Sequence, residues 1–501
     1  MRTVTLENRL KVVQDVPGVS RWDALRAACP TLTEWGLRTL KSGLDAFAQS
    51  IVLEPHYICK DHRNLHSNFY SKKFQEHSSD CARLHFFSRA RLSIGELMFQ
   101  TASLQPEYLG YSVIRPVRDR CLGRTVIDPQ RVGRRVEDGF YTLRTAFEAR
   151  PNGLRLAAHG YPYMSQDGEA IICAHTALWG LCRYFSERYT TYAEQYPYDL
   201  ITMTTDTQGR VVPYRGLTYA DYSRILVNFG RHPEILAIKL KETDPDLGGE
   251  KFLHLCSYVE SGFPVLASFF GHVVTIVGHT MDRQRRPAPD PNGLMDSSAF
   301  LRQFIVVDDN FFPYQLLGYR DDPANYGSAY HQHPYHIGSI RVAVCPLPEK
   351  VYLPSEKARA LFTSLLKSLL QRPRIARALR AGTDDALVTR LLITTSSAFK
   401  RRKLEKGVQG GQVLDPISVK VAGLHLPHFV WLMEVAPVSS YLAGRCTGEV
   451  VLDATANQME EGLLYARAGD ILLLNQQELR VKNRPVDLMT FAQYTHNLGE
   501  Q

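Results

Sequence analysis

The chain has 501 residues, of which 44% are hydrophobic and 22% are charged. This composition is typical of folded globular proteins and excludes general disorder, and the length predicts about two to four domains. The formal charge of +8 arises mainly in residues 351–407, where 13 Lys and Arg stand against 4 Asp and Glu. The charge of the whole chain therefore does not indicate a nucleic-acid-binding protein.

We expect no targeting segment in this sequence. Charges are spread through its N-terminal sequence, and its apolar runs are much shorter than the roughly 20 residues that cross a bilayer. Nine cysteines are scattered along the sequence, an odd number without the spacing of a disulfide framework. These features predict a cytoplasmic protein that does not associate with membranes.

The first part of the chain predicts two segments of an α+β protein. Residues 1–50 have apolar residues at helical spacing and form a helical lead-in, with Ser20 and Thr31 as the expected N-caps. Residues 51–154 form an N-terminal α+β accessory region, in which "IVLEPHYI", "YSVIRPV" and "RTVIDP" are expected to be strands.

Residues 155–350 have the pattern of a central α+β domain. A helix is expected from Cys173 to about Arg188, and three apolar, β-branched runs follow it, "FPVLASFF", "HVVTIVGH" and "QFIVVDD". This order, helices first and then a sheet, is typical of the α+β class.

Residues 351–501 predict a C-terminal accessory region, first basic and helical and then β-rich. Residues 357–371 form a strongly amphipathic helix with leucines on one face. The basic stretch "FKRRKLEKGVQGGQ" is expected to be a loop, and strands are expected at "HFVWLMEVA", "GEVVLDATA" and "GDILLLN".

Cys173 stands at the start of the expected helix, where the helix dipole favours the thiolate, the nucleophilic form. A reactive thiol also needs a base and a group that orients the base. If the second and third strands form a hairpin in which His279 pairs with Leu301, then His272 lies opposite Asp308 on the same face. The hairpin would bring an imidazole and a carboxylate within reach of each other.

A cysteine at a helix start, a histidine at the start of a strand and an aspartate at the end of the next strand together resemble the papain-like cysteine peptidase superfamily. "GHVVTIVGHT" and "FIVVDDN" are similar to its His and Asp/Asn segments, especially in the bacterial branch that includes double-glycine leader peptidases. The similarity covers about residues 160–320. It implies a Cys-bearing helix packed on an antiparallel sheet, with Cys173 as nucleophile, His272 as general base, Asp308 as its orienting partner and Gln166 as oxyanion donor.

Two parts of this pattern stay open. Gln166 lies seven residues before Cys173, whereas the family's glutamine usually lies six residues before its cysteine. Three consecutive residues, Asp308, Asp309 and Asn310, compete for the role of orienting the base.

Other histidines and cysteines offer alternatives. His279 and His175 are rival bases, although strand and helix geometry turn them away from the site. The pairs Cys59–His62 and Cys81–His85 have a spacing that resembles a zinc site. The segment "YHQHPYH" clusters His331, His333 and His336, which are expected to lie in a surface loop near the rim of the site.

The resemblance implies a cysteine-dependent hydrolase, a selective peptidase or isopeptidase that acts on a protein or peptide through a covalent acyl-enzyme and needs no cofactor or metal. An acyl transferase is an alternative, because an amine can replace water in the second step. A catalytically inactive papain-like fold that binds protein or nucleic acid is another. The basic segment 351–407 keeps nucleic acid open as a partner, and the flanking regions suit a regulatory protein.

Overall fold

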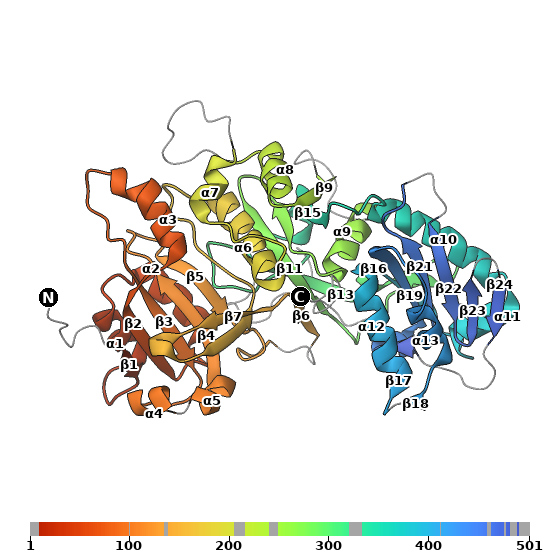
Figure 1. The fold of residues 1–501 in the computed structure, drawn as a ribbon, viewed down its shortest axis with the longest axis horizontal. Helices are drawn as coiled ribbons and strands as arrows, with labels where there is room; N and C mark the ends of the chain where they lie inside the picture. Colours follow the sequence, from red (N-terminus) through yellow and green to blue (C-terminus); the bar gives the residue numbers. More distant parts are fainter. Residues whose placement is uncertain are drawn as a thin grey trace. The chain divides into compact units, whose positions relative to one another are not determined.

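The computed structural model describes residues 10–99, 101–134, 139–204, 216–239, 249–319, 333–410, 412–457, 462–474, 477–480 and 488–489. These residues form a mixed α+β structure (Figure 1), which confirms the predicted class. The chain divides into two compact units that alternate along the sequence. The first unit comprises Met1–Gly230, Leu266–Val277 and Ile305–His336, and the second comprises Arg231–Val265, Gly278–Phe304 and Ile337–Gln501.

The first unit contains a five-stranded antiparallel sheet in the order β1-β2-β3-β4-β5. β3 and β4 are buried along their whole length, which explains their nearly continuous apolar sequences. The strands are β1 (Lys11–Gln14), β2 (Ser50–Tyr57), β3 (Cys81–Phe87), β4 (Tyr108–Ile114) and β5 (Leu122–Ile127). The helices of this region are α1 (Arg21–Ala28), α2 (Glu34–Leu44), α3 (Lys60–Asn68), α4 (Ile94–Phe99) and α5 (Thr101–Leu104).

Of the two predicted N-caps of the first helices, one is confirmed and the other is wrong. Ser20 caps α1, as expected, by accepting a hydrogen bond from the Asp23 amide. The prediction of Thr31 as a cap was wrong, because Thr33 caps α2 by accepting a bond from the Gly36 amide. Both threonines precede the helix, and the sequence pattern does not distinguish them.

The remainder of the first unit carries a two-stranded antiparallel ribbon of β7 and β8 and the helix that begins with Cys173. Its strands are β6 (Phe140–Thr142), β7 (Thr145–Ala149) and β8 (Leu156–Gly160), and its helices are α6 (Cys173–Arg188), α7 (Pro197–Thr202) and α8 (Tyr219–Asn228). The bounds of α6 confirm the helix predicted from Cys173 to about Arg188.

A second sheet has the strand order β14-β13-β11-β10-β15-β9, and β6 pairs with β11 outside this path. Its members are β9 (Arg231–Ala237), β10 (Val265–Ser268), β11 (Val273–Met281), β13 (Leu301–Val307), β14 (Gln315–Leu317) and β15 (Val342–Pro348). The three strands predicted in the central segment are therefore present as β10, β11 and β13. β11 and β13 are neighbours, and the Asp282 amide donates to the Phe300 carbonyl at 2.8 Å where the hairpin closes.

The second unit contains a further sheet in the order β12-β16-β19-β21-β22-β23-β24. β12 lies inside the insertion that links β11 to β13 and pairs in parallel with β16. The strands are β12 (Leu294–Asp296), β16 (Leu387–Thr395), β19 (Phe429–Pro437), β21 (Gly448–Asp453), β22 (Leu463–Ala468), β23 (Ile471–Leu474) and β24 (Gln477–Arg480). Two short pairs are β17 (Val408–Gln409) with β18 (Gln412–Val413) and β20 (Arg445–Cys446) with β25 (Leu488–Met489).

The helices of the second unit include one in a segment that was predicted to be a loop. They are α9 (Glu250–Glu260), α10 (Ser355–Leu370), α11 (Pro373–Arg380), α12 (Ser396–Gly407), α13 (Pro416–Ala422) and α14 (Val438–Leu442). The loop expected at "FKRRKLEKGVQGGQ" was wrong, since α12 occupies most of it. Thr395 caps this helix, Phe399 is fully buried on its inner face, and Lys403 forms a buried ion pair with Glu449.

The predicted boundaries at residues 50, 154 and 350 follow sequence composition and remain a prediction about domains. Residues 1–50 and 51–154 fall within the same compact unit, and residues 155–350 contribute to both units. Within the part of the chain that the structure describes, no helix is both long and apolar enough to cross a membrane.

Candidate active site

Cys173 is the first residue of α6 and differs from the other cysteines in its exposure. It is half-buried, whereas the other eight are buried, and all nine are free thiols. His175 organises the same turn by accepting the Ile172 amide through Nδ1 at 3.4 Å. Burial lowers the pKa of His175 to about 4, so its ring is neutral at pH 7. His175 therefore serves the helix start rather than acting as a second base.

The loop before Cys173 is held by a carboxylate that the sequence reasoning missed. Asp167 Oδ1 accepts the amides of Glu169, Ala170 and Ile171, each at 2.9 Å. Asp167 Oδ2 accepts the hydroxyl of Tyr70 at 2.7 Å. An aspartate that collects several following amides is an Asx-type turn, which "QDG" indicates in retrospect. Asp167 fixes the backbone that leads into α6.

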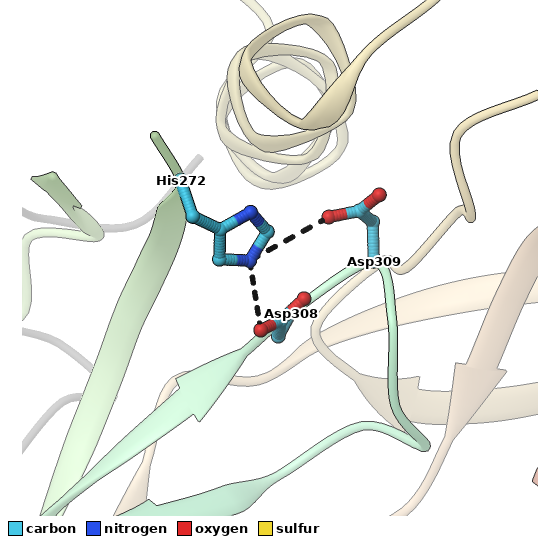
Figure 2. Close-up of side chains that lie close together, drawn as sticks. All are labelled: His272, Asp308 and Asp309. Carbon is cyan, nitrogen blue, oxygen red and sulfur yellow. Dashed lines mark hydrogen bonds and ion pairs between the residues drawn. The ribbon is translucent and has the colours of Figure 1, made fainter. Parts of the chain in front are cut away.

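His272 lies just before β11, and its ring is oriented by Asp308 (Figure 2). Nε2 donates to Asp308 Oδ2 at 2.9 Å, and the ring's other nitrogen points away from both carboxylates. Burial opposes a charge on this ring, yet the hydrogen bonds and charges of Asp308 and Cys173 outweigh it and raise the pKa of His272 to about 11. The three residues that the sequence selected are thus close enough to interact.

The three consecutive residues at the end of β13 have different environments. Asp308 Oδ2 lies 2.9 Å from His272 Nε2, and Asn310 Nδ2 lies 3.3 Å from the same nitrogen. The amide and Nδ2 of Asn310 also donate to Asp308 Oδ1 at 2.8 and 3.0 Å. Asp309 Oδ1 lies 4.0 Å from His272 Nε2. Among the three candidates, the geometry therefore favours Asp308 as the partner of the base.

His333 is a second imidazole on Asp308, which the sequence placed in a surface loop. It is buried, and its Nε2 donates to Asp308 Oδ2 at 2.7 Å. Its Nδ1 accepts the Tyr335 amide at 3.2 Å, which fixes the proton on Nε2. The surface-loop prediction was wrong for His333, because the acidic partner comes from a distant strand; His331 lies outside the described residues.

These two imidazoles determine the charge state of Asp308 and the packing around it. Burial opposes ionisation, but the hydrogen bonds from His272 and His333 hold the pKa of Asp308 well below its usual range. The Tyr335 ring stacks on Phe269 with centroids 4.5 Å apart and on His272 at 5.8 Å. The aromatic rings therefore pack against one face of the His272 imidazole.

Asp309 is buried beside the His272–Asp308 pair but has no comparable hydrogen-bond donors. Neither of its oxygens meets a hydrogen-bond donor in normal geometry, although the Gln166 backbone amide lies near and slightly favours the charged form. Burial and the charge of Asp308 raise the pKa of Asp309 to about 7. The sequence treated Asp309 only as a rival to Asp308 and missed this environment.

A small cavity adjoins the sulfur. It is lined in part by Cys173, Thr176, Thr275, Tyr161 and Asp309, and about 10 Å³ of it admits a water-sized sphere. That space holds about one water molecule. Gln166 is half-buried nearby, and its role as an oxyanion donor stays a prediction.

The histidines of the rival-base and zinc alternatives have hydrogen-bond partners outside the candidate active site. His279 is buried and donates through Nε2 to Glu260 at 2.9 Å. His85 bonds to Glu54 through Nε2 at 2.9 Å and to the Tyr108 hydroxyl through Nδ1. Among the described residues, the proposed zinc set Cys59, His62, Cys81 and His85 does not form a cluster of three or more potential ligand atoms.

Comparison of the chain with family models, with curated proteins and with solved structures gave no match.

Proposed function

We propose that the chain is a cysteine-dependent hydrolase, a selective peptidase or isopeptidase of papain-like design. The observation that carries this proposal is the ordered set Cys173–His272–Asp308, in which a thiol at a helix start interacts with an imidazole that is bonded to a buried carboxylate. Nucleophilic catalysis by cysteine needs these three roles in this arrangement.

Each residue has a distinct task in the proposed reaction. His272 takes the proton of the Cys173 thiol, and the sulfur attacks the carbonyl carbon of the scissile bond. The carbon–nitrogen bond breaks, a thioester forms, and the amine leaves with that proton from His272. Water then attacks the thioester, gives a proton to His272 and releases the acid. Asp308 is a positioning residue that keeps the ring turned toward the sulfur. Gln166 and the amide of Cys173 are the proposed donors to the oxyanion.

Acyl transfer to an amine is the second candidate, because the thioester accepts either nucleophile. A binding module without catalysis is the third. The odd number of cysteines, without the spacing of a disulfide framework, supports a reducing compartment such as the cytoplasm as part of this proposal.

The proposal predicts a burst of acylation. With p-nitrophenyl acetate, the full chain should release one nitrophenolate per molecule rapidly and acquire one acetyl group on Cys173, as detected by mass spectrometry. Cys173→Ala should abolish the burst, and His272→Ala should slow it by about 100-fold or more. His159→Ala, which changes an exposed histidine, is the matched control and should keep the wild-type rate.

Selective labelling of Cys173 alone is not sufficient support, because the other eight thiols are buried. The comparison between the two histidine variants removes this ambiguity, since neither substitution changes the thiol itself. If His272→Ala acylates as fast as wild type, the proposed base has no role and the enzyme proposal fails.

A further inference from the structure

The groups around His272 also have the arrangement of a cation site. His272, Asp308 and Asp309 each present a ligand atom, and these atoms lie within 4.8 Å of one another (Figure 2). In the part of the chain that the structure describes, no other group of three or more His, Cys, Asp or Glu has this property. Two carboxylates from the end of β13 face one ring nitrogen.

The distances are compatible with a bound metal ion, and the type of ligand favours a transition-metal ion over a hard cation. His272 Nε2 is 2.9 Å from Asp308 Oδ2 and 4.0 Å from Asp309 Oδ1. Ligands of a tetrahedral ion with bonds of about 2.0 Å lie about 3.3 Å apart, a value between these two distances. The imidazole ligand also favours Zn²⁺ over Mg²⁺ or Ca²⁺, which prefer sets made only of oxygen.

Asp309 supplies an independent indication of a ligand. Its side chain is only 2% exposed, and both of its oxygens lack a hydrogen-bond partner of normal geometry. Buried carboxylates are otherwise paired, hydrogen-bonded or bound to metal. Its nearby positive group, Arg120, bonds to Asn310 instead. One oxygen of Asp309 faces His272 Nε2, where an ion would lie.

We propose that His272, Asp308 and Asp309 bind one divalent transition-metal ion, with Zn²⁺ as the probe. The ion replaces the proton on His272 Nε2, lies between the two carboxylates, and leaves a fourth position for water or another ligand. Cys173 is not a member of the cluster, so the thiol is not required for binding.

Metal binding has a consequence that rests on the proposed function. A ring with a metal ion on Nε2 keeps its proton on Nδ1, and such a ring cannot accept the proton of the Cys173 thiol. The same ion also occupies Asp308, which otherwise orients the ring. Zn²⁺ is therefore an inhibitor of acylation at Cys173 that acts through the base rather than through the sulfur.

Calorimetric titration of the metal-free full chain with Zn²⁺ under reducing conditions tests the site. Wild type should bind one ion, Asp309→Asn should bind it about ten-fold more weakly or worse, and Cys173→Ala should bind it as wild type does. Asp384→Asn, an exposed aspartate in the other unit, is the matched control and should also bind like wild type. Circular dichroism checks that each variant is folded.

The outcomes separate the metal site from the enzyme proposal. Equal affinity in wild type and folded Asp309→Asn, or no binding by wild type, overturns the metal site. Loss of binding in Cys173→Ala also overturns it, because the ion would then be held by the thiol. If binding depends on Asp309 but the wild-type chain shows no acylation burst, the metal site stands and the proposed function fails. If Zn²⁺ binds and acylation continues unchanged, the inhibitory role is overturned.

Discussion

Asp308 receives two imidazole hydrogen bonds on one carboxylate oxygen, from His272 at 2.9 Å and from His333 at 2.7 Å. The second bond keeps Asp308 ionised and fixed in place, so it supports the orientation of His272 indirectly. We expect His333→Leu to slow acylation of Cys173 about ten-fold and to lower the free energy of unfolding by about 1–3 kcal/mol, because a buried charge loses a donor. Burst kinetics and denaturant unfolding measure the two effects.

A conservative variant separates positioning from packing at His333. The amide of His333→Gln can still donate to Asp308, so this variant should recover most of the acylation rate that His333→Leu loses. A purely structural role predicts instead that the rate follows stability in both variants. If His333→Gln and His333→Leu are equally slow at equal stability, the donor has no positioning role.

The residue types and spacing of the candidate site were partly visible in the sequence. Cys173 begins a helix and His272 immediately precedes a strand, and local patterns indicate both positions. The interaction of His272 with Asp308 was predicted from an assumed hairpin register in which His279 pairs with Leu301. The roles of His333 and Asp309 could not be predicted, because they depend on burial and on contacts between distant segments. Local sequence periodicity does not indicate such contacts.

At the scale of elements, the turn that leads into α6 is held by Asp167, which gathers three amides of the loop. Ala170 and Ile171 are buried, so their amides find no water if the carboxylate is lost. We expect Asp167→Ala to lower the free energy of unfolding by about 1–3 kcal/mol and to slow acylation at Cys173. Asp167→Asn keeps an oxygen acceptor and should retain most of both. Equal losses in the two variants would show that the charge, not the acceptor, matters.

Element predictions succeeded where a periodic pattern was strong and failed where composition dominated. The alternating β-branched residues of β11 and the leucine rows of α10 predicted a strand and a helix correctly. The lysines and arginines of α12 suggested a solvated loop, yet these residues are good helix formers. What stabilises α12 is its cap and the burial of Phe399, and the partners of Phe399 lie in other elements.

At the scale of the whole molecule, the chain passes between the two compact units several times. A reading of the sequence by consecutive segments cannot find such a division, because residues 266–277 and 305–336 join the first unit while their neighbours join the second. The insertion between β11 and β13 shows the same effect, since it supplies β12 to the sheet of the second unit. Long-range pairing, not local composition, decides these boundaries.

The first unit contains three buried histidines that make its stability sensitive to acid. Burial lowers the pKa values of His62, His85 and His175 to about 4, against about 6.5 in an unfolded chain. Between these values the folded state binds fewer protons, so stability falls as the pH drops from 6.5 through 4. At pH 5, each of the three histidines lowers the free energy of unfolding by about 2 kcal/mol. The raised pKa of His272 acts in the opposite sense but contributes only about 1 kcal/mol between pH 7 and 5.

In the second unit, the main buried ion pair loses its stabilising charge only at a lower pH. Burial opposes the charge of Glu260, but Arg390 and His279 lower its pKa to about 2, so its contribution is lost only as the pH falls from about 4.5 through 2. His254 adds a smaller histidine effect, because burial lowers its pKa too. Hydrogen exchange at pH 7 and pH 5, corrected for intrinsic rates, should therefore show lost protection in α3, β3 and α6 before β16 and β19. Equal loss in both sets would contradict this order, because it would place the acid-sensitive groups in both units alike.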